Sequence, residues 1–277
     1  MSRRVFITGA TGFVGRQVLR TLLEHDVKLV CAVREGSEEK LPASPKIERC
    51  VMTADLFAQD QAWWERELQG MDVVAHLAWY AEPGKYQFSA ENLDCLIGTL
   101  CMGRAAAASR VKRFVGVGTC FEYLPSEKPL STDAQIAPSS PYAACKAAAY
   151  FALGQTLPQS GVDFAWCRLF YLYGEGEDSR RLVPTLRQSL SEGRAAYLTS
   201  GNQVRDFLDV REAGRLIAEI ALSTKSGAVN VCSGRAVTVR ELAESIADEY
   251  GRRDLLNFGA RKDNPIDPPH VVGMKSL

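Results

Sequence analysis

Short apolar runs alternate with amphipathic stretches through the first 170 positions of the chain. The apolar runs at 5–8, 27–33, 47–52, 72–78, 112–118 and 164–169 have the length and composition of buried strands. Between them lie segments with helical spacing of apolar residues, such as 17–23, 92–109 and the alanine-rich stretch after Pro141. Regular alternation of strand and helix predicts an α/β fold with a Rossmann-type, doubly wound parallel sheet.

A glycine turn joins the first apolar run to the first helix. Gly9, Gly12 and Gly15 form the pattern G-x-x-G-x-x-G. The first glycine can take backbone angles closed to other residues, the second permits close approach of a pyrophosphate, and the third lets the helix pack closely on the strand. The N-terminus of the helix offers free N–H groups to the phosphates. This context predicts a dinucleotide site rather than a plain turn, formed by Gly9, Thr11, Gly12, Phe13, Val14 and Gly15.

The end of the second strand bears on the choice of cofactor. An acidic residue there accepts hydrogen bonds from the adenine ribose and selects NAD, but here Val33 is followed by Arg34. A guanidinium at this point would pair with a 2′-phosphate, which favours NADP. Two alternatives stay open: Glu35 could point inward and bind the ribose of NAD, or Arg34 could be a solvated turn residue.

Further candidates stand at the ends of the third and fourth strands. Asp55, followed by Leu56, could accept from the adenine amino group or cap the next helix. Leu77 and Ala78 end the fourth strand on the cofactor side. The aromatic loop after them, with Tyr80, could form a wall of the substrate pocket or simply cover the core. His76, inside this buried strand, is expected to be a hydrogen-bonded core histidine and not a catalyst.

Charge and cysteine content exclude several classes of function. Lys+Arg and Asp+Glu are both 33 among 277 residues, so nothing favours nucleic acid or an anionic membrane as partner. No apolar run is long enough to span a bilayer. The eight cysteines form no C-x-x-C and there are only three histidines, which argues against a metal site. Cysteines in apolar strands are expected to be reduced thiols of a cytoplasmic protein.

Catalytic chemistry is suggested by a tyrosine and a lysine four residues apart. Tyr142 and Lys146 follow Pro141 in a helical segment, so their side chains share one face. The fifth strand ends shortly before, in Thr119. The spacing of the pair alone is common by chance, and its position after this strand in a chain that opens with the glycine turn makes the set specific.

Together these motifs resemble a known family. The TGATGFVG turn at 8–15, the HLA segment at 76–78, Thr119, the Tyr142-x-x-x-Lys146 pair and the RDFLDV segment at 205–210 are similar to the extended short-chain dehydrogenase/reductases that act as nucleotide-sugar epimerases, dehydratases and reductases. The resemblance implies that Tyr142 is the general acid/base, that Lys146 holds the nicotinamide ribose and favours the phenolate, and that Thr119 aligns the substrate oxygen.

The same resemblance implies a substrate site beside these residues. It implies that Arg205 clamps the substrate diphosphate, with a surface salt bridge to Asp206 or Asp209 as the alternative. Where the family often has Asn-Val-Tyr-Gly, this chain has Tyr171-Leu172-Tyr173-Gly174. The residues expected to contact the substrate are Tyr80, Thr119, Cys120, Tyr142, Tyr171 and Arg205.

We expect residues 1–169 to form the dinucleotide-binding domain, with 205–225 returning to it. Glycine and proline become frequent after the sixth strand, so residues 170–204 and 226–277 are expected to form a smaller C-terminal substrate-binding lobe. The family resemblance also implies a homodimer formed through the helices after the fourth and fifth strands.

Three functions are compatible with this pattern. Dehydratases of the family follow the threonine with Asp-Glu, and here Cys120 and Phe121 follow it, which disfavours dehydration. The first function is an NADPH-dependent 4-ketoreductase acting on a nucleotide-linked 4-keto-6-deoxyhexose, in deoxysugar and hence lipopolysaccharide or glycan biosynthesis. The second is an NAD-dependent nucleotide-sugar 4-epimerase. The third is a non-catalytic dinucleotide-sensing protein, against which the Tyr142–Lys146 pair argues.

Overall fold

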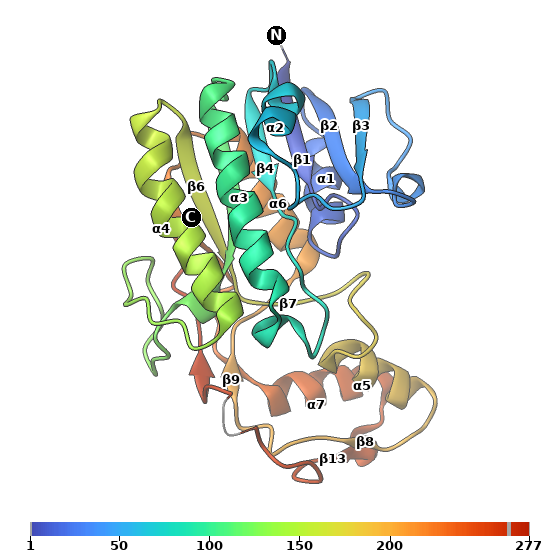
Figure 1. Cartoon of the computed structure of the whole chain (residues 1–277). Helices are drawn as coiled ribbons and strands as arrows, with labels where there is room; N and C mark the ends of the chain where they lie inside the picture. Colours follow the sequence, from blue (N-terminus) through green and yellow to red (C-terminus); the bar gives the residue numbers. More distant parts are fainter. Residues whose placement is uncertain (1, 265–266, 277) are drawn as a thin grey trace.

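Seven parallel strands form the central sheet of the computed structural model, which describes residues 2–264 and 267–276 (Figure 1). The sheet confirms the α/β, Rossmann-type fold predicted from the alternation of apolar runs. In their order across the sheet the strands are β11 (Gly227–Val231), β6 (Asp163–Leu169), β5 (Arg113–Thr119), β4 (Val73–His76), β1 (Arg3–Thr8), β2 (Val27–Arg34) and β3 (Ile47–Thr53).

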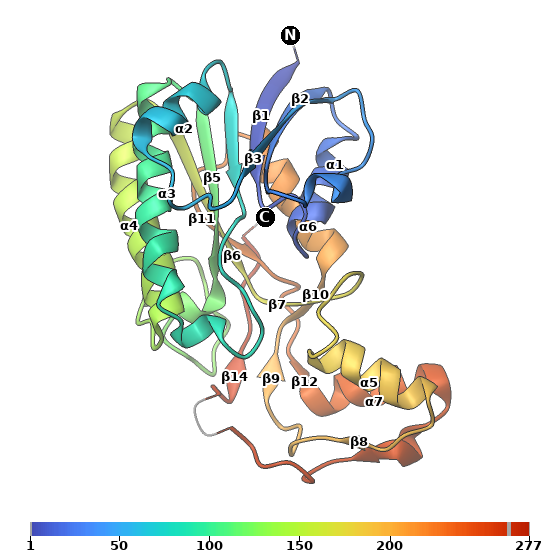
Figure 2. The ribbon, with the colours of Figure 1, turned by 45° about the vertical axis from the view of Figure 1, so that its right-hand side comes forward.

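Helices cover both faces of this sheet (Figure 2). Successive side chains of a strand point to opposite faces, so Val5 and Ile7 join one hydrophobic cluster and Phe6 joins the other. The first cluster includes residues of α1 (Gly15–Leu22) and α6 (Val210–Leu222). The second includes residues of α2 (Gln61–Leu68), α3 (Glu91–Ala108) and α4 (Pro141–Gln159).

The strand order changes direction at β1. The chain proceeds from β1 outward through β2 to β3, and then returns to place β4 on the other side of β1. In an open parallel sheet, ligands bind at the carboxyl ends of the strands beside such a switch point. A ligand-binding site is therefore expected at the loops that follow β1, β4 and β5.

A smaller lobe lies beyond the carboxyl ends of the sheet (Figures 1 and 2). Its two helices, α5 (Leu182–Ser191) and α7 (Val239–Tyr250), share a hydrophobic cluster of their own. Three small sheets accompany the lobe. Two have two strands each: β7 (Tyr171–Tyr173) with β10 (Phe207–Asp209), and β8 (Ala196–Tyr197) with β13 (Leu256–Asn257). The third has three strands: β9 (Val204–Arg205) between β12 (Val237–Thr238) and β14 (His270–Val271). The 3-10 turns are η1 (Glu38–Lys40), η2 (Tyr86–Phe88), η3 (Cys120–Glu122) and η4 (Arg253–Leu255).

The seventh strand differs from the division expected from the sequence. The sequence pattern does not predict β11 and groups residues 226–277 with the lobe, whereas Gly227–Val231 pairs with β6 in the large sheet. The segment is short and includes the polar residue Asn230, so its sequence pattern does not indicate a buried strand. Asn230 is buried and satisfied there: it accepts from the Tyr123 hydroxyl at 2.7 Å and donates to the Leu130 carbonyl at 2.8 Å.

A buried carboxylate ties the strands beneath the lobe to the chain that follows β11. Asp206, between β9 and β10, accepts from the backbone N–H and the hydroxyl of Ser233, both at 2.7 Å. It also accepts from the N–H groups of Gly234 at 2.9 Å and Gly273 at 3.1 Å. With four donors on one buried carboxylate, segments far apart in the sequence are held together at the base of the lobe.

The described residues contain neither a candidate membrane-spanning helix nor a candidate metal cluster. None of the helices in that part of the chain is long and apolar enough to cross a membrane. No three or more His, Cys, Asp or Glu side chains gather there as a metal ion would require.

Candidate active site

The glycine loop after β1 packs so closely that side chains cannot be added at two of its positions. Gly9 has φ +72°, and a Cβ on it would lie 2.8 Å from the backbone nitrogen of Ala78 at the end of β4. A Cβ on Gly15 would lie 1.9 Å from the carbonyl oxygen of Gly9. At Gly12 the nearest atom would be 3.3 Å away, so this residue faces more open space. The positive φ of Gly9 and the close packing at Gly15 agree with the roles predicted for these two glycines, and the role of Gly12 beside a pyrophosphate stays a prediction.

The N-terminus of α1 is available to an anion. Val14 is its N-cap, no described side chain caps it, and its first turn holds no acidic residue. The helix dipole and the N–H groups at the start of the helix favour a phosphate at this point. Thr11 and Phe13 are half-buried beside the loop. The loop and the helix therefore fit the pyrophosphate of a dinucleotide.

The end of β2 presents a free guanidinium. Arg34 is the last residue of the strand and is exposed, and no ion pair engages it within the described part of the chain. Glu35 follows it and is also exposed. Both groups are free to meet the adenosine end of a dinucleotide.

Asp55 does not cap the helix that follows it. Its carboxylate accepts from the backbone N–H of Phe57 at 2.9 Å, and α2 is capped instead by Asp60, which accepts from Trp63 N–H at 2.7 Å. The capping alternative for Asp55 is therefore wrong. Asp55 is exposed in the loop after β3, and Leu56 beside it is buried.

Tyr142, Lys146 and Thr119 come together beside the carboxyl end of β5. Ser140 caps α4 by accepting from Ala143 N–H at 3.3 Å, and Tyr142 and Lys146 follow on one face of the first turns. Thr119 is the last residue of β5 and is buried, and its hydroxyl accepts from Phe121 N–H at 3.3 Å. Burial raises the pKa of Tyr142 above its usual value, and the nearby Thr119 side chain acts against that rise.

Lys146 is a buried amine with few polar contacts. Its side chain is 3% exposed, and Nζ donates to the Val117 carbonyl at 2.6 Å. Burial lowers the pKa of Lys146 to about 7, because removal from water disfavours the ammonium form. The charge of this group is therefore sensitive to its immediate neighbours at neutral pH.

A buried ion pair behind Thr119 was not predicted from the sequence. Glu122 accepts from Thr119 N–H and from Trp166 Nε1, both at 2.9 Å, and from Arg168 Nε at 2.7 Å. Both charged side chains are fully buried. The one available signal was Arg168 inside an apolar strand, since a buried charge requires a partner. The pair fixes the turn that carries Thr119.

Three further residues predicted at the substrate site lie on different parts of the chain: Cys120 begins η3, Tyr80 is in the loop after β4, and Tyr171 begins β7. Cys120 is buried directly after Thr119, and burial raises the pKa of its thiol to about 12. Tyr80 donates its hydroxyl to Glu82 at 3.1 Å. The hydroxyl of Tyr171 is buried and has no hydrogen-bond partner in the described part of the chain. An unsatisfied buried hydroxyl of this kind is available to a ligand.

Arg205 is buried at the junction of the sheet and the lobe. Its Nη1 donates to the Val204 carbonyl at 2.8 Å, and its Nη2 lies 2.7 Å from a carboxylate oxygen of Asp267. The guanidinium carbon also lies 5.0 Å from the ring centroid of Tyr171. The alternative of a surface pair with Asp206 or Asp209 is wrong.

Those two acids have other partners. Asp206 accepts the four bonds at the base of the lobe, and Asp209 caps α6 and pairs with Arg211. The sequence pattern does not predict the pairing of Arg205 with Asp267, because Asp267 lies 62 positions further along the chain, directly before Pro268 and Pro269.

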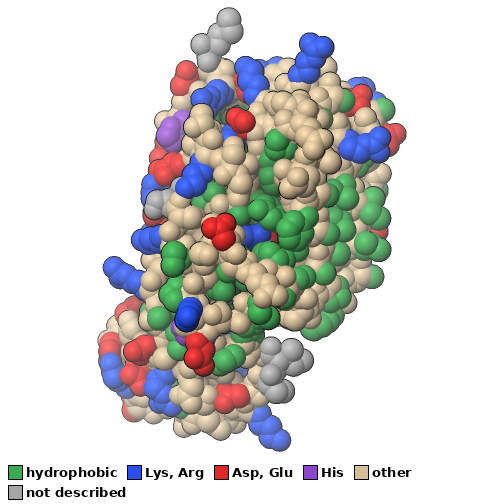
Figure 3. Space-filling view, turned by 90° about the vertical axis from the view of Figure 1, so that its left-hand side faces the viewer, with side chains coloured by type: hydrophobic (Ala, Val, Ile, Leu, Met, Phe, Trp, Pro, Cys, Tyr) green, Lys and Arg blue, Asp and Glu red, His purple; other side chains and the backbone are tan. Residues whose placement is uncertain are grey.

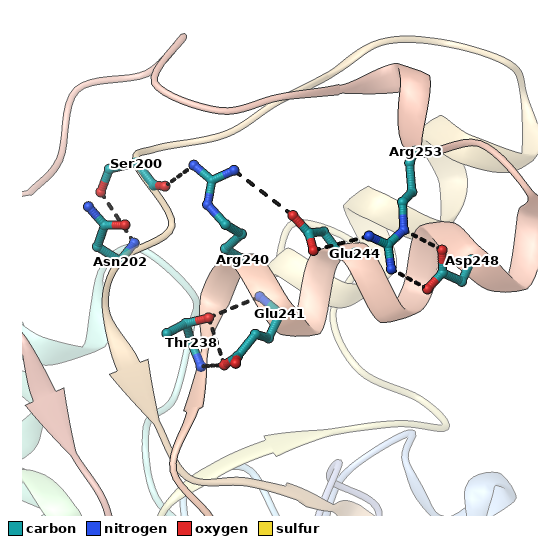
Figure 4. Close-up of polar contacts among 8 residues, drawn as sticks. All are labelled: Ser200, Asn202, Thr238, Arg240, Glu241, Glu244, Asp248 and Arg253. Atoms are coloured by element: carbon teal, nitrogen blue, oxygen red, sulfur yellow. Dashed lines mark hydrogen bonds and ion pairs between the residues drawn. The ribbon is translucent and has the colours of Figure 1, made fainter.

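The loop before Arg205 is anchored to α7 by a chain of polar contacts (Figure 4). Arg240 Nη2 donates to the Ser200 carbonyl at 2.9 Å, and Arg240 also approaches Glu244 at 4.0 Å. Arg253 bridges Glu244 and Asp248 further along the helix. A capping box of Thr238 and Glu241 starts α7. The lobe therefore holds the strand that carries Arg205 in a fixed position.

His76 is a satisfied core residue, as expected. One ring nitrogen is 2.8 Å from the Thr8 hydroxyl and the other is 2.9 Å from the Thr99 hydroxyl. Burial lowers its pKa to about 3, so it is neutral at ordinary pH. Thr8 also accepts from Ala78 N–H at 3.2 Å, so this small network links β1 to the end of β4.

A parallel sheet of this order, with a glycine loop at its switch point and a Tyr142–Lys146 pair beside it, defines an enzyme of the extended short-chain dehydrogenase/reductase class. Residues 5–232 match the family described as the NAD dependent epimerase/dehydratase family, and the chain belongs to that family.

Relatives and a solved structure agree with this assignment. The chain is 25% identical over 275 residues to the dTDP-6-deoxy-L-talose 4-dehydrogenase (NAD(+)) of Aggregatibacter actinomycetemcomitans, covering 98% of this chain and 99% of the relative. It is 28% identical to the dTDP-6-deoxy-L-talose 4-dehydrogenase (NAD(P)(+)) of Kitasatospora kifunensis, covering 90% and 79%. The structure of UDP-N-acetylglucosamine 4-epimerase from Methanobrevibacter ruminantium M1 in complex with UDP-N-acetylmuramic acid superimposes with a TM-score of 0.85 at 25% identity, covering 99% and 90%.

Proposed function

We propose that this enzyme is a 4-ketoreductase that uses NADPH to reduce the 4-keto group of a nucleotide-linked 4-keto-6-deoxyhexose. The observation that carries the proposal is that Tyr142 and Lys146 follow each other on α4, and that Lys146 bonds to the Val117 carbonyl of β5, the strand that ends in Thr119. Two relatives named as 4-dehydrogenases of a dTDP-6-deoxy sugar add support, because the reverse of their reaction reduces a 4-keto group. Cys120 and Phe121 stand where a dehydratase would need a pair of carboxyl groups.

The protonation state of the site suits reduction. The reduced dinucleotide supplies a hydride to C4 of the sugar, and the carbonyl electron pair moves onto its oxygen. Tyr142 gives its phenolic proton to that oxygen, and its raised pKa keeps the phenol protonated at neutral pH. Thr119 donates a hydrogen bond to the same oxygen and so orients the carbonyl. Lys146 supplies a nearby positive charge that stabilises the phenolate left behind.

The junction with the lobe suits a nucleotide diphosphate. Arg205 offers a planar fork of donors, and the ring of Tyr171, whose hydroxyl has no partner among the described residues, lies beside it. A diphosphate would compete with the Asp267 carboxylate for the same guanidinium. Phosphate contacts at this point are remote from C4, and they contribute to binding and positioning.

NADP is the cofactor that we propose, with NAD as the alternative. The exposed, unpaired guanidinium of Arg34 fits a 2′-phosphate. One relative is named for NAD(+) and the other for NAD(P)(+), so both dinucleotides occur among the relatives.

A 4-epimerase with tightly held NAD is the second candidate, favoured by the similarity to the UDP-N-acetylglucosamine 4-epimerase structure. Mass identification of cofactor released from the purified protein separates the two functions. Retained NAD supports the epimerase, and an empty protein with NADPH-dependent turnover supports the reductase.

We expect Tyr142→Phe to fold and bind the dinucleotide but to lose turnover by roughly 10²- to 10⁴-fold, since it removes the general acid. Steady-state rates on a nucleotide-linked 4-keto sugar are the measurement. Tyr197→Phe is the matched control, because Tyr197 is 63% exposed on the lobe and should retain full activity. Equal rates for Tyr142→Phe and the unmodified enzyme would reject the proposed chemistry.

Arg34→Ala should weaken NADPH about 10- to 100-fold and leave NADH nearly unchanged, because only NADPH carries the 2′-phosphate. Fluorescence titration with each reduced dinucleotide measures both affinities. Arg66→Ala, which removes an exposed guanidinium from α2, serves as the control. Equal losses for the two cofactors would mean that Arg34 does not read the phosphate.

Arg205→Ala should raise KM for the nucleotide sugar roughly 10- to 100-fold with little change in dinucleotide affinity, because the lost contacts are charge-assisted hydrogen bonds. Asp267→Asn is the companion variant, because it removes the carboxylate that would compete with the diphosphate and leaves the Arg205 guanidinium in place. We expect its KM to be unchanged or lower. An unchanged KM in a folded Arg205→Ala variant would show that Arg205 does not bind the substrate.

A homodimer is the assembly that we propose, through the faces of α3 and α4. Leu93, Ile97 and Phe151 are 57%, 58% and 52% exposed on these two helices. Figure 3 shows hydrophobic side chains gathered on the side of the molecule to which α4 belongs. Ile97→Glu should convert a dimer to a monomer in light scattering, whereas Leu124→Glu, outside the two helices, should not. A monomeric unmodified protein would exclude this interface.

A further inference from the structure

The loop between β4 and α3 places an aromatic ring against each member of the Tyr142–Lys146 pair. The ammonium nitrogen of Lys146 lies 3.8 Å from the ring centroid of Trp79. The ring of Tyr86 lies 4.8 Å from the ring of Tyr142, centroid to centroid, at an interplanar angle of 89°. Neither contact follows from the motifs that identify the family. Both come from the loop at 79–89, for which the sequence left open a covering role.

One buried side chain links the two aromatic residues. Asn92, in the first turn of α3, is 1% exposed. Its Oδ1 accepts from Trp79 Nε1 at 2.9 Å, while its Nδ2 donates to the backbone carbonyl of Tyr86 at 2.6 Å and to that of Ser89 at 2.9 Å. The amide therefore fixes the tilt of the indole and the path of the loop at the same time.

The indole face matters because Lys146 has few other groups to stabilise its charge. An ammonium over a tryptophan face is attracted by the negative face of the ring, and the attraction is strongest where water is excluded. The ring of Trp166 is more distant, at 5.8 Å. The only hydrogen bond from Lys146 among the described residues is to the Val117 carbonyl.

The titratable neighbours of Lys146 come from three other elements and from its own helix. Glu122 on η3 is negative and favours the ammonium, as the thiol of Cys95 on α3 does when ionised. His76 on β4 interacts with Lys146 but is neutral at ordinary pH. Tyr142 on the same helix is a neutral phenol. Burial raises the pKa of Cys95 to about 11 and lowers that of His76 to about 3, so neither group is charged near neutral pH.

We propose that Trp79 is a positioning residue for the catalytic pair: its indole face holds the Lys146 ammonium in place and charged, and Asn92 locks the indole in the required orientation. The importance of this contact for turnover rests on the function proposed above. The contact itself, and its effect on the protonation of Lys146, do not depend on the substrate.

The direction of the effect on pH dependence follows from the sign of the interaction. The indole stabilises the protonated amine, so removing the ring lowers the pKa of Lys146 below its present value of about 7. The expected shift for a desolvated site is about one pH unit. In the reductive direction the ammonium is the active form. Turnover of the variant should therefore fall about twofold at pH 6, fivefold at pH 7 and tenfold at pH 8.

The decisive measurement is an NMR titration of protein labelled with ¹³C at lysine Cε, with the Lys146 signal assigned by its absence in Lys146→Met. Trp79→Leu should move the Lys146 midpoint down by about one unit. Trp79→Phe keeps an aromatic face and should recover more than half of that shift. Trp63→Leu removes a tryptophan from α2 and should leave the midpoint unchanged.

Asn92→Ala provides a second test, because it retains both aromatic rings and releases the indole. We expect a midpoint between those of Trp79→Leu and the unmodified protein. If Trp79→Leu folds and the Lys146 midpoint is unchanged, the inference is overturned. If Trp79→Leu does not fold, an unchanged midpoint in Asn92→Ala overturns the inference instead.

Failure of the proposed function would look different. Tyr142→Phe would then retain the activity of the unmodified enzyme, or no nucleotide sugar would be reduced, while the Lys146 titration would still respond to Trp79. A shifted midpoint without the pH-dependent loss of turnover would overturn the catalytic part of the inference alone.

Discussion

Close approach of three backbone segments at the end of β1 determines where every part of the site can lie. The carbonyl of Gly9 meets the first turn of α1 at Gly15, and the Cα of Gly9 faces Ala78 at the end of β4. A single methyl group at either glycine would overlap backbone atoms, and backbone cannot move aside as a flexible side chain can. The start of α1 and the segment after β4 are thereby held close to Gly9, and the loop after β4 begins at a fixed point.

From that fixed point the chain reaches the catalytic pair through buried polar contacts. Thr8, His76 and Thr99 join β1, β4 and α3. Glu122 and Arg168 join the turn after β5 to β6. Each group is costly to bury alone and is stable only with its partner, so the two networks favour one arrangement of the strands. Rigid support of this kind fixes the positions of Thr119 and of the loop that packs on Lys146.

Local patterns were sufficient to predict most of the sheet. The glycine turn could be recognised because its spacing is set within one strand–turn–helix unit, and Tyr142 and Lys146 could be placed on one helix face because they are four residues apart. β11 was not found, because Asn230 interrupts its apolar pattern and its hydrogen-bond partners lie 100 and 107 positions away. The same reason hid the partner of Arg205 and the pair formed by Glu122 and Arg168, which are 46 positions apart. The fold determines which distant residues become partners of a buried charge, so local sequence patterns do not predict these partners.

The four hydrogen bonds to Asp206 have a consequence for how such an enzyme can diverge. Three of them come from Ser233 and Gly234, just after β11, and one comes from Gly273, close to the end of the described chain. Beyond this joint, α5 and α7 have a separate hydrophobic cluster. Loops at the outer edge of the lobe can therefore lengthen, shorten or change sequence while the joint stays constant. Variation in these loops would leave the hydrogen bonds to Asp206, and the strands that they join, in place.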